Sequence, residues 1–152
     1  GFWREPIHGL DLSSLQEVEL SQGRTVQLKV ESAALLSQGK SVIELDLQNA
    51  SVNEVYSDCQ LQFDIARDGV LNGFCIWFEA DLAPSVTLDT GPSSPETHWA
   101  QTYAPFPPQH VRAGEALEVS AQLSYDAEKE AVSRDVEVWL RVGDTEVGYL
   151  IE

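Results

Sequence analysis

The segment from Ser94 to Thr102 gathers residue types that proteins use to hold and orient a polar substrate. His98 is the side chain best suited to acid–base chemistry near neutral pH. It stands between the hydroxyl residue Thr97 and the indole of Trp99, whose π face can stack on a guanidinium. The segment therefore predicts a loop whose chemistry would suit an arginine side chain as substrate.

These residues also have a purely structural interpretation. A single histidine on a surface loop commonly does no more than cap a turn. Trp99 could equally be a core tryptophan, as we expect Trp3, Trp77 and Trp139 to be. The flanking residues, rather than the histidine itself, favour the functional interpretation.

Other kinds of site receive little support. His8 and His110 have no spacing with His98 that is typical of a metal triad, so we expect no metal site. Ser94 and His98 lack the glycine pattern of a nucleophile elbow and an obvious orienting acid, which argues against a hydrolase dyad. There is also no Gly-rich loop of the kind that holds phosphates.

Length and composition predict one globular domain over residues 1–152, because 43% apolar residues can form a single core. No stretch approaches the roughly 20 apolar residues of a membrane span, and we expect a soluble protein without membrane contact. The sequence contains no methionine, which predicts that it is a piece of a longer protein and that further chain precedes Phe2.

The two cysteines, Cys59 and Cys75, are too few for a disulfide scaffold and lack the paired spacing of a zinc site. We expect free thiols in a reducing, intracellular compartment, cytoplasmic or nuclear. A single bridge between the two stays open as the alternative, because strands can bring distant positions together.

The charge balance is strongly acidic, with 25 Asp and Glu against 9 Lys and Arg and a net charge of −16. Such a chain repels nucleic acid phosphates, so we expect no direct nucleic acid partner. The simpler interpretation of this charge is that it keeps the protein soluble. The more specific interpretation is that it attracts a cationic partner, such as an Arg-rich peptide, towards a nearby site.

Alternation of apolar and polar residues with a period of two runs from Val26 to the end and predicts an all-β, antiparallel barrel or barrel-like sandwich. A short helical turn near Asp11 or Ser13 is compatible with the capping residues there. The strands that this pattern predicts cover about 26–30, 43–47, 61–65, 70–78, 86–88, 117–125, 136–142 and 147–151.

Two features of the middle of the chain predict its local pairing. Asp68-Gly69 between apolar runs is a hairpin signal, and the long apolar run from Val70 to Phe78 predicts a central strand covered on both faces. The twenty residues after Leu88 carry five prolines, which predict a long ordered loop.

Several motifs occur in the order found in the C-terminal half of protein arginine methyltransferases. They are Gly9-Leu10-Asp11-Leu12-Ser13, Leu71-Asn72-Gly73-Phe74-Cys75-Ile76-Trp77-Phe78, Leu88-Asp89-Thr90-Gly91-Pro92 through Gln101, and Val111-Arg112-Ala113-Gly114-Glu115. The sequence thus resembles the C-terminal β-barrel domain of that family over nearly its whole length. The Thr-His-Trp loop and the Gly-Phe-x-x-Trp-Phe strand are the specific parts of the resemblance.

The resemblance implies a substrate-binding barrel that completes the active site of an S-adenosylmethionine-dependent enzyme. His98 would pair with an acid of an N-terminal cofactor-binding domain, Trp99 would line the groove for the substrate arginine, and Thr97 would help to set the loop. The parent protein would be a homodimer that methylates Arg-rich proteins or peptides. This chain would bind no cofactor and would not be active alone.

The sequence departs from the family's pattern in ways that matter. The cofactor loop and the paired-glutamate loop are absent, the helical dimerisation arm would lie upstream of Phe2, and Ala100 stands where many members carry lysine. Two alternatives stay open: a stand-alone β-sandwich module that binds a sugar or peptide through Trp99 and Tyr103, and a structural domain whose charge keeps an assembly soluble.

Overall fold

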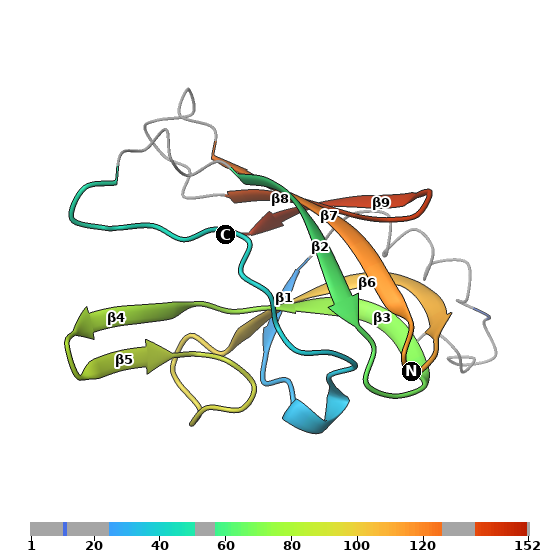
Figure 1. Cartoon of the computed structure of the whole chain (residues 1–152), viewed down its shortest axis with the longest axis horizontal. Coiled ribbons are helices and arrows are strands. Elements are labelled where there is room, and N and C mark those ends of the chain that lie inside the picture. Colours follow the sequence, from blue (N-terminus) through green and yellow to red (C-terminus); the bar gives the residue numbers. More distant parts are fainter. Residues whose placement is uncertain (1–10, 12–24, 51–56, 126–135, 152) are drawn as a thin grey trace.

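The structure, a computed structural model, describes residues 11, 25–50, 57–125 and 136–151. Two antiparallel sheets face each other, and a two-stranded ribbon projects from one of them (Figure 1). The antiparallel all-β class predicted from the sequence, a barrel or barrel-like sandwich, is confirmed. In the described part of the chain the only helical element is the 3-10 turn η2 (Ser32–Ala34), and no helix there has the length and hydropathy of a membrane span.

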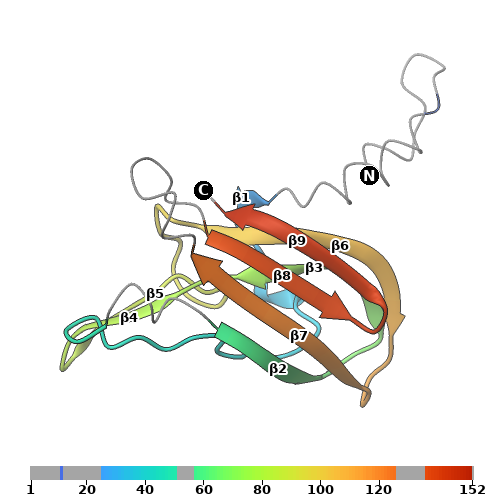
Figure 2. The ribbon, with the colours of Figure 1, turned by 90° about the horizontal axis from the view of Figure 1, so that it is seen from above.

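The upper sheet in Figure 1 has four strands in the order β2-β7-β8-β9. These strands are β2 (Ser57–Asp64), β7 (Ala116–Tyr125), β8 (Val136–Val142) and β9 (Thr145–Ile151). Seen from above, they run side by side across the lower sheet (Figure 2). Their alternation places one face against the lower sheet, as the buried and exposed positions along β8 show.

The lower sheet has three strands in the order β1-β6-β3, and the ribbon continues from β3. The strands are β1 (Val26–Leu28), β3 (Gly69–Ile76), β6 (Gln101–Val111) and, in the ribbon, β4 (Glu79–Ala83) and β5 (Val86–Asp89). The core lies between the two sheets. Its buried apolar residues are Ile65, Leu71, Ala104, Phe106, Val111, Val119, Ala121, Val138, Leu140, Val142, Val147 and Tyr149.

The hairpin predicted at Asp68-Gly69 is wrong. The strands on either side of this turn, β2 and β3, belong to different sheets and pair with β7 and β6. The turn between β6 and β7 changes sheet in the same way, and the two turns bind each other. The N–H of Ile65 donates to Glu115 O at 2.9 Å, and the N–H of Gly114 donates to Ile65 O at 2.8 Å. The burial of apolar side chains between sheets therefore overrides the local turn signal.

The long loop predicted after Leu88 is wrong over Gln101–Val111, where β6 forms the middle of its sheet. Two of its three prolines lie where the pairing with β3 is irregular. Gly73 pairs with Pro105 and Leu71 with Gln109, so Pro107 and Pro108 lie in a register irregularity. On the other edge, β1 pairs with β6 only up to Tyr103. A strand with one partner and a bulge tolerates prolines there.

Two further strand predictions need correction. The run from Val70 to Phe78 is not a central strand, because β3 ends at Ile76 and lies at the edge of its sheet. The segment 43–47 forms no strand. Asp46 instead accepts hydrogen bonds from the N–H of Gln48 at 3.0 Å and from Nδ2 of Asn49 at 2.7 Å, and these bonds turn the chain and lower the pKa of its carboxyl.

The structure also describes the two cysteines and two of the three tryptophans that the sequence predicts as core residues. Cys59 and Cys75 are free thiols in different sheets. Trp139 is 43% exposed, so its prediction as a core residue is wrong, whereas Trp77 is half-buried. The helical turn predicted near Ser13 and the position of Trp3 lie outside the described residues.

Candidate functional site

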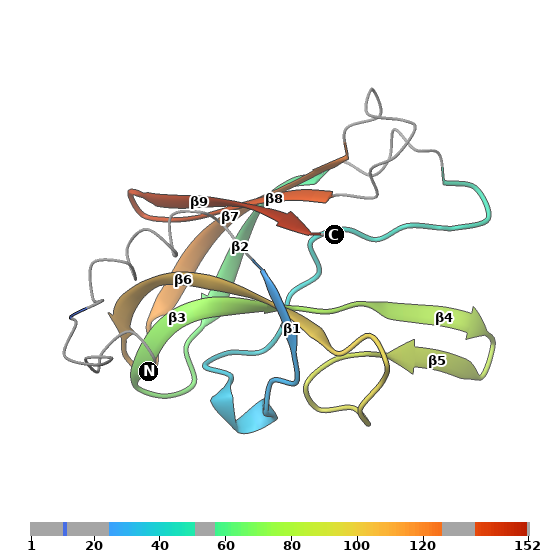
Figure 3. The ribbon, with the colours of Figure 1, turned by 180° about the vertical axis from the view of Figure 1, so that it is seen from behind.

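The loop from Thr90 to Ala100 joins the ribbon to β6 and carries His98 and Trp99 (Figure 3). Its first residue is fixed by Phe78, which directly precedes β4. The N–H of Thr90 donates to Phe78 O at 3.1 Å, and its hydroxyl bonds both the N–H and the carbonyl oxygen of Phe78, at 3.1 and 2.9 Å. Thr90 is 1% exposed, so these bonds are shielded from water and hold the start of the loop firmly.

The end of the loop is fixed by the buried side chain of Gln101, the first residue of β6. Its Nε2 donates to Thr90 O at 2.6 Å, and its Oε1 accepts from the N–H of Val30 at 2.8 Å. One amide thus joins the start of the loop, its end and the segment after β1. Because Gln101 is 6% exposed, both of its polar atoms need these partners.

Between these anchors the loop turns tightly. Asp89 accepts from the N–H of Gly91 at 2.7 Å and from the hydroxyl of Ser94. Gly91 is buried, and a Cβ atom on it would lie 2.9 Å from Nε1 of Trp77, so glycine is required at this close approach. The loop closes with Ala100 at a φ of 50°, where its N–H donates to Thr97 O at 3.2 Å.

The loop holds both predicted side chains outward. His98 is exposed, Trp99 is 54% exposed, and their ring centroids are 6.5 Å apart. The indole meets the ring of Phe78 edge to face, with centroids 5.9 Å apart and an interplanar angle of 80°. Trp99 is therefore positioned by an aromatic neighbour and still offers surface to a ligand.

Thr97 differs from its two neighbours because it faces inward. Its Oγ1 atom is buried and has no hydrogen-bond partner among the described residues, while its carbonyl oxygen closes the turn to Ala100. Nearby, Nζ of Lys29 lies 3.7 Å from Oε2 of Glu96. Both of these side chains are exposed, so this ion pair adds little stability but does lie between β1 and the loop.

The sequence predicts no role in this site for Phe78, Thr90 or Gln101. The sequence places Phe78 at the end of the predicted strand 70–78, and nothing in the local pattern marks Thr90 or Gln101 as buried polar residues. The one feature of the sequence that could have indicated these roles is that Thr90 and Gln101 stand at the two ends of the loop and have side chains that can form hydrogen bonds with the backbone. Long-range contacts decide their roles, because their partners lie 11, 12 and 71 residues away.

The structure also describes Ser94 and His110, which belong to the hydrolase and metal sites that the sequence disfavours. The hydroxyl of Ser94 donates to Asp89, which gives it a structural role in the turn. The described residues hold no group of three His, Cys, Asp or Glu side chains that could bind a metal ion. His110 lies near the far end of β6 from Gln101 and is exposed.

A β-sandwich with an internally braced loop that displays a histidine and a tryptophan is the class of domain that this structure defines. The chain belongs to the arginine methyltransferase oligomerization subdomain family, whose family model matches residues 1–145.

Known proteins agree with this assignment. The chain is 29% identical over 110 residues to an arginine N(omega)-methyltransferase of Streptomyces achromogenes, covering 72% of this chain and 30% of that protein. It is 34% identical over 74 residues to human protein arginine N-methyltransferase 2, covering 44% of this chain and 17% of that protein. The chain thus spans less than a third of the length of these curated relatives.

The fold is also that of a solved relative. A chain of the PRMT1 enzyme-prozyme heterotetrameric complex of Trypanosoma brucei, solved with AdoHcy, superposes with a TM-score of 0.81 at 20% identity. The match covers 99% of this chain and 50% of that one. At this level of identity the likeness supports the fold alone.

Proposed function

We propose that this chain is the substrate-binding barrel of a protein arginine N-methyltransferase and completes its active site with the loop 90–100. The observation that carries the proposal is the outward display of His98 and Trp99 on a loop fixed at both ends by Thr90 and Gln101. Family membership and the methyltransferase relatives support it. A loop that is ordered before the substrate arrives loses little entropy when it binds.

Each loop residue has a distinct role in this proposal. The half-exposed ring of Trp99 stacks on the guanidinium of the substrate arginine, and Phe78 holds that ring in place. His98 pairs with a carboxylate of the cofactor-binding domain and thereby orients an acid that contacts the guanidinium. Thr97 sets the loop through its carbonyl bond to Ala100.

S-adenosylmethionine supplies the methyl group in this reaction. We assign its binding to an N-terminal domain outside this chain, because the family resemblance places the Gly-rich cofactor loop in that domain and this sequence carries no such loop. The fragment alone would then be inactive. The net charge of −16 suits attraction of an Arg-rich protein or peptide.

The assembly and the location follow from the same proposal. The family description supports oligomerisation, and we propose a homodimer for the parent protein. Two free thiols are compatible with an intracellular location. Sedimentation of the full-length protein tests the dimer.

The experiment that tests the function measures methyl transfer to an Arg-rich peptide by the full-length protein. We expect His98→Ala to lower kcat/KM by about 10²-fold or more, as for loss of an acid–base group. Trp99→Ala should act mainly on KM, by about 2- to 30-fold, which corresponds to a cation–π contact of about 0.5–2 kcal/mol.

Matched controls come from the same chain. His110→Ala removes an exposed histidine from the other end of β6, and Trp139→Ala removes a half-exposed tryptophan from the upper sheet. Both should leave kcat/KM nearly unchanged. Absence of methyl transfer by the full-length wild-type protein, together with ligand binding by the isolated chain that depends on Trp99, would instead support the stand-alone binding module.

A further inference from the structure

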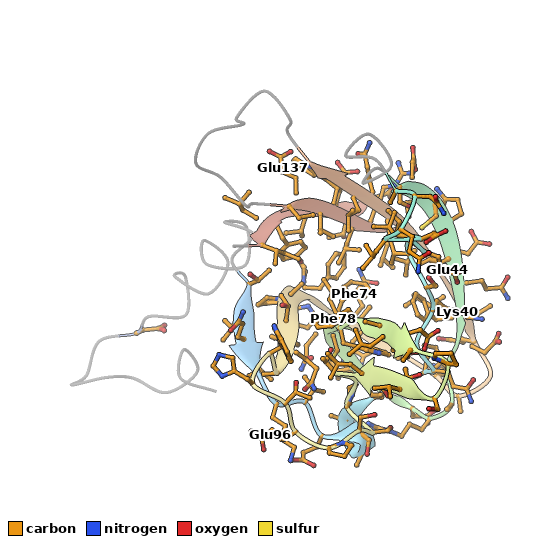
Figure 4. The ribbon with its side chains drawn as sticks, turned by 90° about the vertical axis from the view of Figure 1, so that its left-hand side faces the viewer. Lys40, Glu44, Phe74, Phe78, Glu96 and Glu137 are labelled. Atoms are coloured by element: carbon orange, nitrogen blue, oxygen red, sulfur yellow. The ribbon has the colours of Figure 1, made fainter. Side chains whose placement is uncertain are left out.

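The inner face of the lower sheet continues onto the ribbon, beyond the ends of the four-stranded sheet (Figure 1). Phe74 packs in the core against Phe106, with ring centroids 5.3 Å apart. Residues two and four positions further on, Ile76 and Phe78, follow on the same side by strand alternation. Figure 4 shows Phe74 and Phe78 on the side of the lower strands that faces the four-stranded sheet.

The ribbon has one polar and one apolar face. Glu79 pairs with Asp89 and Asp81 with Thr87 on the polar face, where the hydroxyl of Thr87 donates to Asp81 Oδ1 at 2.7 Å. The opposite face carries only apolar side chains. Its members are Phe78, Ala80, Leu82, Ala83, Val86 and Leu88, with Ala80 paired to Leu88 and Ala83 to Val86 across a bulge at Leu82.

This apolar face is largely open to water. Phe78 is 42% exposed, Val86 is 50% exposed and Leu82 is 65% exposed. A two-stranded ribbon is marginally stable by itself and needs packing on one face. A contiguous apolar patch on a projecting element is also the usual mark of an interaction surface.

We infer that the apolar face of the β4–β5 ribbon is the docking surface for the cofactor-binding domain, an inference that rests on the proposed function. The face is continuous with the loop, because the ring of Phe78 touches that of Trp99. A domain that binds the loop in its active site therefore also contacts the neighbouring ribbon. The acidic groups Glu79, Asp81 and Asp89 lie on the opposite, polar face, so the surface presented to the partner domain is uncharged.

Two observations favour this occupant over a second copy of the chain. The chain spans 30% of the Streptomyces relative, so a protein of that kind has ample further sequence to cover the ribbon. A second copy on the same face would also cover Trp99, which is 54% exposed and which the proposed function requires to be open to the substrate.

The test uses thiol labelling of the full-length protein at two adjacent positions of β5. Val86→Cys places a thiol on the apolar face and Thr87→Cys places one on the polar face, and both positions are exposed in this chain. We expect the thiol at position 86 to react about tenfold or more slowly than that at position 87, because docking buries only one face. The wild-type protein gives the background from Cys59 and Cys75.

The possible outcomes separate the alternatives. Equal labelling rates at the two positions would overturn the inference, as would protection at position 86 that disappears on dilution, since the latter identifies a second copy. Leu82→Cys repeats the measurement at a more exposed position if Val86→Cys does not fold. Methyl transfer is assayed on the same samples. Protection without methyl transfer refutes the proposed function only, and methyl transfer without protection refutes the docking surface only.

Discussion

Gln101 spans the base of the loop and donates from Nε2 to the carbonyl oxygen of Thr90 at 2.6 Å. Eleven residues separate the two along the chain, and both are buried. This bond closes the loop that carries His98 and Trp99 without using either of them. The outward position of the two rings therefore depends on Gln101, whose side chain bonds to Thr90 and Val30 rather than to either ring.

Replacement of Gln101 should loosen the loop. Gln101→Ala leaves Thr90 O and the N–H of Val30 without their partner, which costs about 1–3 kcal/mol in the free energy of unfolding for buried groups. Urea denaturation measures this loss. Gln101→Glu is the matched control, because it keeps an acceptor for Val30 but no donor for Thr90. An Ala variant as stable as the wild type would show that the amide does not anchor the loop.

Ala100 offers a test of backbone strain at the end of the loop. Its φ of 50° lies in the left-handed region, which costs a residue with a Cβ about 1 kcal/mol relative to glycine. We expect Ala100→Gly to be neutral or to raise the melting temperature, and Ala100→Val to lower it. Differential scanning calorimetry distinguishes these results. The reverse order of the two variants would contradict the assigned conformation.

The hydroxyl of Tyr149 joins the two sheets by donating to Pro105 O at 2.6 Å. Tyr149→Phe should lower the free energy of unfolding by about 1 kcal/mol. Burial, with a smaller contribution from Tyr103, raises the pKa of Tyr149 above its ordinary value. The folded state then keeps its proton where an unfolded tyrosine ionises, so stability should fall as pH rises above about 10.

The pH dependence provides the control for this prediction. Denaturation of the wild type and of Tyr149→Phe between pH 8 and 11 should show a shallower loss of stability in the variant, because the variant lacks this titrating group. Parallel pH profiles would mean that Tyr149 does not contribute to the linkage.

Cys75 should be a poor nucleophile at neutral pH. Burial raises the pKa of its thiol to about 11, so little thiolate is present below that pH. We expect slow alkylation at pH 7.5 and a rate that rises steeply towards pH 11, measured by mass spectrometry. The raised pKa also means that stability falls between about pH 8.5 and 11, where the unfolded thiol ionises first. Cys75→Ser should remove the product alkylated at position 75, while Cys59, the other free thiol, is followed separately by its peptide mass.

The sequence by itself determined the class of the fold and the residues of the loop. Alternation with a period of two fixes one wet and one apolar face on each strand whatever the partner is, and β7, β8 and β9 follow it closely. The grouping of Thr97, His98 and Trp99 could likewise be identified from the sequence, because the three residues are neighbours in the chain. Their catalytic and binding roles stay a prediction.

Only the tertiary structure decided how the strands pair and what holds the loop. Asp68-Gly69 looks like a hairpin, yet β2 and β3 separate because each buries its apolar face by joining a different sheet. Pro107 and Pro108 of β6 are tolerated because the ladder shifts register between Pro105 and Gln109. Gln101 bonds to residues 11 and 71 positions away. Such contacts depend on how distant segments meet, which a local pattern of residues does not encode.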